Sequence, residues 1–512
     1  MKNMKKITFY FFILIYSGYL NALTKNDVLS VQNGIYYLDG APFAEIGWNK
    51  FDINWLFFTE VYANRTLTDN NSMVVKQRNS MRELSEAGFK TIRFFGMVHP
   101  SDFQEKWLPN WNNANQRNAK CNAPMDKAIA ICEEFNIRAI ISLMADNFVN
   151  TSVVPAEDYK DLIANRNSQS RKDLYAYLDY VITRYKDRRG VLAWEVSNEM
   201  TLDVDINPGT RIASNGERRP TAAELSQFYK DVCARIKSID NLRMVTSGGS
   251  VLREMAYGLS QLTETQTAWP ARDTYNQHKS MYSMLYVNTG FENVDIHFYT
   301  KKAPNYQILN NNGQPLQLTV KGYNDMMTSL GVPLMIGEYG ALPKVDKTNK
   351  MYWLTGDDWF TTFENETDTA QMYVQEACDN AVNSGCRLIY WWCYDSHRPQ
   401  DQNDRERMDL DKVRTPILFQ KVVDANRRLK QKFNITSINE PSIQDRKLWF
   451  SDGKLCCSSD YIGKHCRVYN AQGVLLQQFI SANSIELKYD GLLIVKVEDK
   501  TIKIFNSKVK NQ

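Results

Sequence analysis

Apolar residues follow two alternating patterns along most of this chain. In one kind of segment they return every three or four positions, which predicts an amphipathic helix. A Gly or Asn turn follows, and then a short, almost continuously apolar run, as expected for a strand buried on both faces of a parallel sheet. This helix-then-strand unit recurs, and its strands are predicted in KTIRFFG, IRAIISLMA, VLAWEVSNE, LRMVTSGG, VPLMIGEYG and CRLIYWWCYD.

Two further apolar runs, PFAEIGWN and ENVDIHFYT, complete a set of eight strands. Eight strands with intervening helices predict an α/β protein with a (β/α)8 (TIM) barrel over roughly residues 40 to 433. The segment LSVQNGIYYLDG ahead of the first strand predicts a hairpin that covers the barrel floor, with a turn at Asp39-Gly40.

Helix ends are marked by residues with special backbone or capping properties. Gly88, Gly331 and Gly385 stand where a helix C-cap favours a left-handed residue. Thr415 followed by Pro416 predicts the start of the last helix, with Thr415 as the N-cap.

The pattern changes after about residue 436. A polar linker, SINEPSIQDRKLW, leads into short alternating segments separated by turn-like breaks. This predicts a small all-β module, a sandwich, over residues 437–512. The barrel domain is then expected over residues 23–436.

The first 22 residues are typical of an export signal. Lys2, Lys5 and Lys6 precede an apolar stretch over residues 7–20, and a cleavage site is expected after Ala22. An uncleaved anchor is the alternative, although a membrane span needs roughly 20 apolar residues. The prediction is a secreted, periplasmic or cell-surface protein with no integral membrane span after signal cleavage.

Composition narrows the range of partners. The net charge is only +4, and no basic block occurs before the extreme C-terminus, so no nucleic-acid partner is expected. No spacing among the 9 Cys and 5 His is typical of a metal site, and no metal or cofactor is expected. The 11 Trp and 27 Tyr provide both core and stacking surfaces for flat ligands such as sugars.

Two glutamates, each near the end of an apolar run, carry the candidate chemistry. Glu199 closes VLAWEVSNE, and Glu338 lies near the end of VPLMIGEYG. In a parallel barrel the C-terminal strand ends all face one mouth. Two carboxyl groups meeting there are the minimum equipment for cleaving a glycosidic bond, so a polysaccharide or oligosaccharide substrate is expected.

The barrel resembles glycoside hydrolase family 5, of clan A, over nearly its whole length. The motifs that carry the resemblance fall in order along the strands: Arg93 in TIRFFG, Asn198-Glu199, His297 and Tyr299 in DIHFYT, Glu338 in IGEYG, and tryptophan in IYWWCYD. Several stretches are most similar to the endo-β-1,4-mannanase branch of that family: IISLMADN, VLAWEVSNE, ARIKSIDN and SLGVPLMIGEYG.

Two positions depart from that branch. Met200 stands where a proline commonly follows the Asn-Glu pair, and Phe148 stands where the branch tends to have Trp. The leading hypothesis is a secreted retaining hydrolase of the endo-β-1,4-mannanase type. The alternatives are a β-glucanase (cellulase) or exo-acting glycosidase of the same family, or a polysaccharide-binding protein that has lost catalysis.

The resemblance implies a double displacement with the two carboxyl groups roughly 5 Å apart. Glu338 would be the nucleophile and Glu199 the acid/base. Arg93 is the expected donor to Glu338, because a guanidinium offers a fixed fork and cannot lose its charge. Tyr299 would donate its hydroxyl to Glu338.

The remaining candidates are substrate-binding residues. His297 is expected to reach the sugar or Glu199, and Asn198 to contact the sugar 2-hydroxyl. Trp391 and Trp392 are neighbours on one strand and must point to opposite faces, so only one can stack on the sugar; Trp392 is preferred because it shares parity with two tyrosines. Asn147, after the third strand, is expected to line the cleft.

The C-terminal module resembles the sorting or accessory β-sandwiches attached to secreted bacterial enzymes. The phrase VYNAQGVLLQQF, followed by DGLLIVKV and TIKIFN, carries this resemblance, although Leu493 replaces the usual tyrosine. A carbohydrate-binding module is the competing interpretation.

Overall fold

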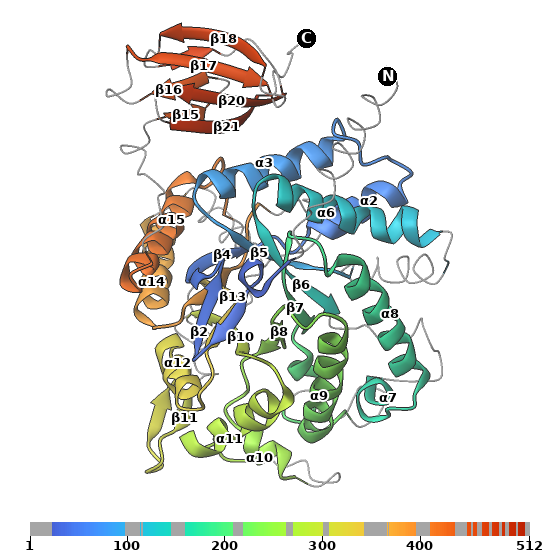
Figure 1. The fold of residues 1–512 in the computed structure, drawn as a ribbon. Coiled ribbons are helices and arrows are strands. Elements are labelled where there is room, and N and C mark those ends of the chain that lie inside the picture. Colours follow the sequence, from blue (N-terminus) through green and yellow to red (C-terminus); the bar gives the residue numbers. More distant parts are fainter. Residues whose placement is uncertain are drawn as a thin grey trace, which may run out of the picture. The chain divides into compact units, whose positions relative to one another are not determined.

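The computed structural model divides the chain into two compact units, Met1–Ile435 and Thr436–Gln512 (Figure 1). The residues that the structure describes are 23–97, 113, 116–144, 159–207, 219–262, 270–300, 307–341, 366, 368–395, 410–435, 448–451, 454–457, 463–470, 474–480, 484–486, 491–497 and 500–506.

The first unit is built on a parallel sheet that closes on itself. Its strands are β4 (Glu45–Asn49), β5 (Thr91–Phe95), β6 (Arg138–Met144), β7 (Val191–Ser197), β8 (Val245–Thr246), β9 (Gly249–Ser250), β10 (Val294–Thr300), β13 (Leu334–Ala341) and β14 (Leu388–Trp391). The sheet order runs β8-β7-β6-β5-β4-β14-β13-β10-β9. Because β8 and β9 are separated by only two residues, they are halves of one interrupted strand, and the eight-stranded ring closes. The predicted (β/α)8 barrel is confirmed.

Amphipathic helices cover the outside of the ring (Figure 1). The helices expected from the apolar spacing are α3 (Ser72–Glu86), α6 (Ala123–Glu134), α8 (Gln169–Tyr185), α9 (Ala222–Ile239), α12 (Val320–Thr328), α14 (Asp368–Asn383) and α15 (Pro416–Lys432). Their apolar faces pack with the outward-facing strand residues into one large core. This double burial explains why the strands read as continuous apolar runs.

The predicted hairpin over the barrel floor is present. Strands β1 (Ser30–Gln32) and β2 (Ile35–Leu38) pair antiparallel, and the short strand β3 (Ala41–Pro42) extends them. Hairpin side chains and inward-facing barrel side chains form a separate core, which includes Leu29, Tyr36, Leu38, Phe43, Ile140, Met244, Met335 and Tyr390. The hairpin therefore fills the end of the barrel at which the strands begin.

Helix-end predictions were right for glycine and partly wrong for threonine. Gly88, Gly331 and Gly385 all have a positive φ. Helix α15 does begin at Pro416, but Thr415 makes no side-chain cap. Its hydroxyl is bound to the backbone of Asp411 instead.

The long segment after the fifth strand contains helices of its own. It folds into α10 (Ala256–Ser260), α11 (Tyr275–Leu285) and η4 (Val287–Thr289). The hairpin of β11 (Gln307–Leu309) and β12 (Pro315–Gln317) joins this excursion through backbone hydrogen bonding of Leu309 to Asp273 at 2.8 Å.

Smaller helical elements accompany these parts. They are η1 (Lys25–Asp27), α2 (Ile53–Tyr62), η2 (Arg117–Asn122), α7 (Tyr159–Ala164) and η3 (Met200–Asp203). Of these, η3 matters most for the site, because it begins directly after Glu199.

The second unit consists of β-strands in the part that the structure describes. One sheet has β15 (Leu448–Ser451), β16 (Lys454–Cys457) and β19 (Ser484–Glu486). The other has β18 (Leu475–Ile480), β17 (His465–Asn470), β20 (Gly491–Val497) and β21 (Lys500–Asn506), in that order. The strands coincide with the alternating segments of the sequence.

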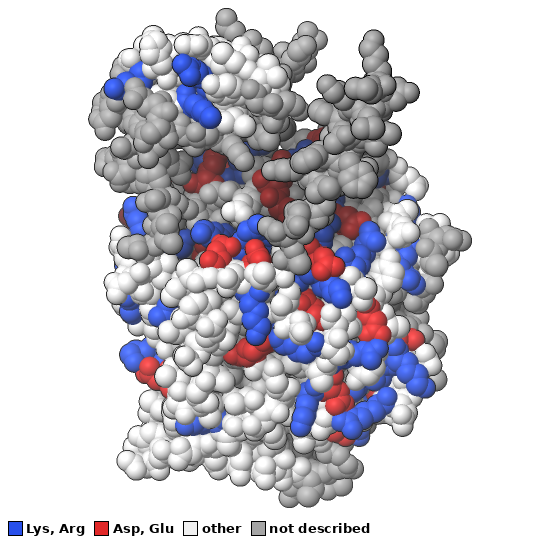
Figure 2. Space-filling view, in the orientation of Figure 1, with Lys and Arg blue, Asp and Glu red and all other residues white. Residues whose placement is uncertain are grey.

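Charged side chains of both signs are mixed over the described surface shown in Figure 2. Among the described residues, no helix combines the length and the apolar character that crossing a bilayer requires.

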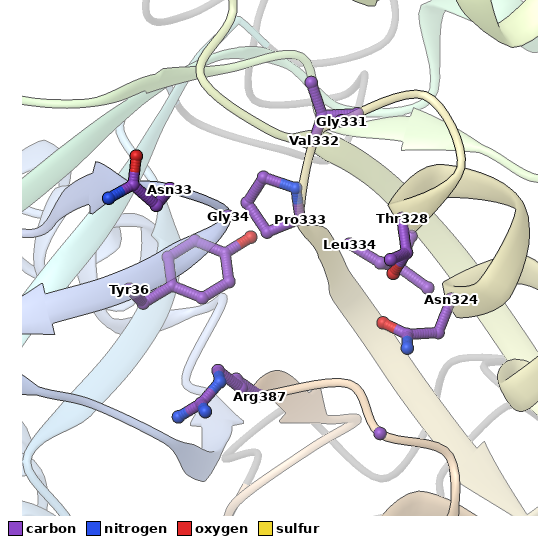
Figure 3. A pocket seen from close by; sticks show the side chains of 11 residues that line it. Asn33, Gly34, Tyr36, Asn324, Thr328, Gly331, Val332, Pro333, Leu334 and Arg387 are labelled. Carbon is purple, nitrogen blue, oxygen red and sulfur yellow. The ribbon is translucent and has the colours of Figure 1, made fainter.

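A pocket of about 280 Å³ lies at the floor of the first unit (Figure 3). It is bounded by the β1–β2 turn, by α12 and its C-terminal turn, and by the starts of β13 and β14. Among the lining residues are Asn33, Tyr36, Asn324, Thr328 and Arg387. Since these surround the ends where the strands begin, the pocket is remote from Glu199 and Glu338.

Candidate active site

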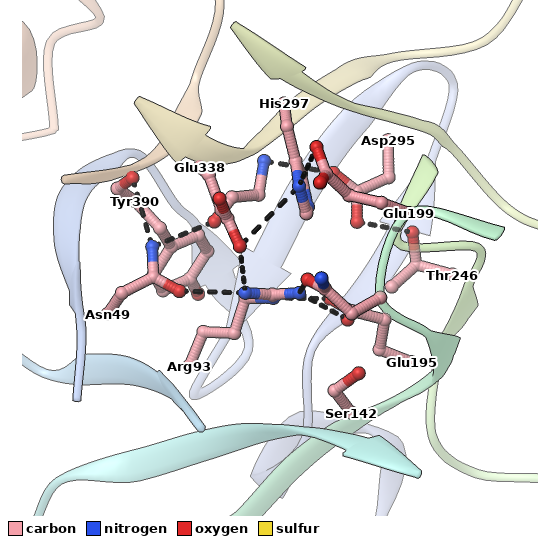
Figure 4. Close-up of polar contacts among 12 residues, drawn as sticks. Asn49, Arg93, Ser142, Glu195, Glu199, Thr246, Asp295, His297, Glu338 and Tyr390 are labelled. Atoms are coloured by element: carbon pink, nitrogen blue, oxygen red, sulfur yellow. Dashed lines mark hydrogen bonds and ion pairs between the residues drawn. The ribbon is translucent and has the colours of Figure 1, made fainter. Parts of the chain in front are cut away.

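Arg93 is the centre of a buried polar cluster inside the barrel mouth (Figure 4). Its Nε and Nη2 each donate to the carboxylate of Glu195 at 2.7 Å. Nη1 donates to Asn49 Oδ1 at 2.9 Å and to Glu338 Oε1 at 3.0 Å, and Nη2 also donates to Asn198 Oδ1 at 2.7 Å. The five N–H groups of the guanidinium thus have five acceptors. Burial opposes the charge, but Glu195 and Glu338 outweigh it and raise the pKa of Arg93.

Glu338 is held from both sides. Its Oε1 accepts from Arg93, and its Oε2 accepts from the hydroxyl of Tyr299 at 2.6 Å. The side chain of Glu338 is only 7% exposed, whereas that of Glu199 is 24% exposed. Ligand atoms of Glu199, His297 and Glu338 lie within 4.8 Å of one another, so the two carboxyl groups are close enough for a retaining arrangement.

The backbone at Glu199 is bent to bring its side chain over the mouth. Glu199 has φ +50°, in the left-handed region, directly before η3. Its N–H donates to the carbonyl of Gly248 at 2.7 Å, in the interruption between β8 and β9. Gly248 has φ +68°, and a Cβ there would overlap the carbonyl oxygen of Ser197. The break in the fifth strand therefore requires glycine and gives the acid/base candidate its place.

His297 and Glu338 are register partners on adjacent strands β10 and β13. His297 Nδ1 lies 3.2 Å from Glu199 Oε1 and 3.5 Å from Glu338 Oε1. Burial favours the neutral ring, but the carboxylates of Glu338 and Glu199 outweigh it and raise the pKa of His297 to about 9. The ring is therefore a cation at neutral pH.

The structure separates the two tryptophans. Trp392 is half-buried and stacks on Phe51, with ring centroids 4.6 Å apart, near Phe95. Trp391 is 1% exposed and packs against Trp48 in the core between strands and helices. Trp391, the less favoured of the two candidates for stacking on the sugar, therefore lies on the face of β14 that the helices cover.

Asn198 and Asn147 are two further predicted substrate residues. Asn198 lies next to Glu199, and the contact of its Oδ1 with Arg93 sets the direction of its amide. Asn147 lies outside the described residues, as does Phe148.

Sequence reasoning missed Asn49. Asn49 ends β4 beside Arg93, and its Nδ2 donates to the carbonyl of Gly337 at 2.9 Å, next to Glu338. A polar residue that ends an apolar strand run was the available signal. Glu195 is fully buried and holds Arg93 in place, so it supports the site without contacting substrate in the proposed mechanism.

The clustered atoms of Glu199, His297 and Glu338 raise the question of a cation. The guanidinium of Arg93 already lies 3.0 Å from Glu338, and His297 is itself charged. Two resident positive charges disfavour a metal ion here, so we assign the three residues no metal role.

A (β/α)8 barrel with two adjacent carboxyl groups at the strand C-termini, one of them held by arginine and tyrosine, defines a carbohydrate-cleaving enzyme of the retaining type. The family model for cellulase (glycosyl hydrolase family 5) matches residues 54–397, and the chain belongs to this family of glycoside hydrolases.

Solved structures of two carbohydrate-cleaving enzymes share the fold at low identity. An endo-1,4-beta-mannanase from Rhizomucor miehei is 13% identical, with a TM-score of 0.52 over 79% of this chain and 99% of that chain. A family 5 mannosidase from the same organism is 13% identical, with a TM-score of 0.54 over 81% and 100%. No curated protein matches the chain in sequence.

Proposed function

We propose that this chain is an exported endo-β-1,4-mannanase-like enzyme, with Glu338 as the nucleophile and Glu199 as the acid/base. The observation that carries the proposal is the pair of carboxyl groups within 4.8 Å, in which both oxygens of Glu338 accept hydrogen bonds while Glu199 is more exposed. Glu338 is thereby fixed in orientation. Glu199 is open to the solvent with which an acid/base must exchange protons.

The reaction follows from this geometry in two steps. Glu338 attacks the anomeric carbon while the bond to the leaving oxygen breaks and Glu199 gives that oxygen its proton. In the second step Glu199 takes a proton from water, the water oxygen attacks the anomeric carbon, and Glu338 leaves as the carboxylate. Asn198 is proposed to donate to the sugar 2-hydroxyl, and Trp392 to stack on a sugar face.

The choice of mannan rests on the mannanase-like sequence stretches, and the names of the two structural neighbours agree with it. The name of the matching family model favours a second candidate, a cellulase acting on β-glucan. Exo-action is the alternative that the mannosidase neighbour brings. A non-catalytic polysaccharide-binding role is opposed by the complete set of Glu199, Glu338, Arg93 and Tyr299.

Export and the C-terminal unit complete the proposal. Residues 1–22 are proposed to be a cleaved signal, which makes the mature enzyme secreted, periplasmic or attached to the cell surface. The C-terminal β-unit is proposed to be a sorting or accessory module rather than a carbohydrate-binding one.

The first experiment is reducing-end release by residues 23–512 on galactomannan, glucomannan, carboxymethylcellulose, mixed-linkage glucan and xylan. Glu338→Ala is the inactive control, and far-UV circular dichroism checks its folding. Activity on the mannans that the variant lacks supports the proposal. Activity on the glucans alone selects the cellulase alternative, and a variant as active as the wild type removes Glu338 as nucleophile.

A further inference from the structure

Behind the reacting carboxyl groups lies a further buried acid that neither reacts nor pairs with Arg93. Asp295 is fully buried on β10, two residues before His297. Its Oδ1 accepts from the N–H of Gly337 at 2.9 Å, and its Oδ2 lies 3.3 Å from the hydroxyl of Thr246. Figure 4 shows its carboxyl group beside the ring of His297.

Gly337 is what allows this approach. A Cβ at Gly337 would lie 2.6 Å from Asp295 Oδ1 and 3.1 Å from His297 Nε2. The glycine before Glu338 therefore leaves room for the acid and the imidazole against the same stretch of backbone. His297 points Nδ1 toward Glu199 and Glu338, so Nε2 is the side of the ring that shares this space with Asp295.

The charges of the buried cluster do not balance if every acid is ionised. Glu195, Asp295 and Glu338 are the acids, and Arg93 and His297 are the bases. Three anions against two cations leave one uncompensated charge in a region almost closed to solvent, which is strongly unfavourable. One proton on one of the acids restores neutrality.

The hydrogen bonds and ion pairs of the three acids indicate which of them holds this proton. Glu195 has two N–H donors of Arg93 at 2.7 Å, and Glu338 has Arg93 and Tyr299. Asp295 is the only one of the three with no cation within ion-pair distance in the described structure. Its neighbour Thr246 can accept as well as donate, so it can serve the protonated form.

Asp295 is surrounded by side chains that titrate or carry a charge. The charged or titratable side chains that act on it or feel its charge are Tyr36, Arg93, Glu195, Tyr229, Tyr286, His297, Cys386 and Tyr390. Burial raises the pKa of the tyrosines and of the cysteine, so these groups are neutral near pH 7. Arg93 and His297 are the cations, and both are engaged by other carboxylates.

We infer that Asp295 is a positioning residue that carries a proton during turnover, so that the positive charge of His297 serves only the two reacting carboxyl groups. An ionised Asp295 would compete for that charge. The inference rests on the roles proposed for Glu199 and Glu338. Burial, together with the charge of Glu195, raises the pKa of Asp295 to about 8, although His297 and Arg93 act in the opposite direction.

The test compares Asp295→Asn with the wild type in urea unfolding from pH 5 to pH 7.5. A folded Asp295 that binds a proton released on unfolding makes the wild type less stable as pH rises, and Asn removes this dependence. The ratio of folding constants, variant to wild type, should therefore rise by up to about tenfold per pH unit. A ratio that is flat over this range means that Asp295 is ionised in the folded protein and overturns the inference.

Activity gives a second readout. The amide imitates a neutral acid, because its oxygen can accept from Gly337 and its NH2 can donate to Thr246. We expect kcat/KM at pH 6 to stay within about threefold of the wild type, and the ratio of variant to wild type to rise above pH 8, where only the wild type can ionise. A tenfold or greater loss at pH 6 contradicts the inference. Asp273→Asn, a buried aspartate outside the cluster, is the control and should leave the pH profile of activity unchanged.

The two proposals fail in different ways. The unfolding ratio needs no substrate, so it decides the proton on Asp295 even if every polysaccharide is left intact. Should Asp295→Asn fail to fold, ¹³C spectra of wild-type enzyme labelled at the aspartate carboxyl groups take its place. A carboxyl group still protonated at pH 6.5 supports the inference, and its absence overturns it.

Discussion

The contact between Arg93 and Glu195 makes a sharp prediction about stability. Both side chains are fully buried, and all five N–H groups of Arg93 have an acceptor. Glu195→Gln replaces a carboxylate oxygen by an NH2 group, which cannot accept. At least one N–H of Arg93 then has no partner, and a donor faces the cation.

The magnitude follows from burial. Losing a hydrogen bond to a charged group costs about 1.5–3 kcal/mol, and leaving a buried donor unpaired adds about 1–3 kcal/mol. The sum agrees with about 3–5 kcal/mol for breaking a buried ion pair by removing one partner. Against a typical total stability of about 5–15 kcal/mol, this is a large loss.

A matched pair on the surface provides the control. Asp179 and Arg235 form the same two-pronged contact, with Nε to Oδ1 at 2.7 Å and Nη2 to Oδ2, but their side chains are 39% and 43% exposed. Asp179→Asn should cost less than about 1 kcal/mol, because exposed ion pairs contribute little.

The assay is equilibrium urea unfolding of both variants and the wild type at pH 7. A loss for Glu195→Gln no larger than the loss for Asp179→Asn would refute the reasoning from burial. Because the guanidinium of Arg93 also holds Glu338 and Asn198, kcat/KM of Glu195→Gln should fall by at least about tenfold as well.

Three further predictions concern the site. Tyr299→Phe removes the donor to Glu338 and should lower kcat/KM by about 10–100-fold without changing the urea midpoint; unchanged kinetics would argue against this contact. Gly248→Ala should destabilise the protein by more than about 2 kcal/mol and abolish activity. Gly313→Ala is the control and should cost about 1 kcal/mol, because Gly313 also has a positive φ, +79°, but an added Cβ there would meet open space. Because its pKa rises from 6.5 to about 9 on folding, His297 contributes stability that is complete below pH 6.5 and lost as pH rises through 9. His297→Gln should remove that part of the pH dependence of unfolding, and an unaltered profile would contradict the assignment.

The barrel was predictable because its strands are buried on both faces. That burial produces continuous apolar runs, and the position of Glu338 near the end of one run placed it at the mouth. The pairing of Arg93 with Glu338 and of Tyr299 with Glu338 followed from strand order and from the expected family geometry.

Other features depend on three-dimensional detail that the chain does not display. The interruption of the fifth strand at Gly248 and the left-handed backbone of Glu199 depend on contacts between neighbouring strands. Asn49 is a lone polar residue whose partners are far away in sequence. Trp391 and Trp392 could be told apart only by alternation, and the same alternation fails at Tyr394, which packs outward against Trp48.

The hairpin at the barrel floor determines how substrate, product and water enter and leave the site. Leu29, Tyr36 and Leu38 fill the end of the barrel where the strands begin. Substrate, departing sugar and attacking water must therefore all pass through the mouth at the other end. In the proposed mechanism, water can reach the glycosyl group held on Glu338 only after the first product has moved aside. A second sugar bound at the mouth then competes with water for that glycosyl group. Because the floor is closed, the balance between hydrolysis and sugar transfer depends on whether water or a second sugar occupies the mouth.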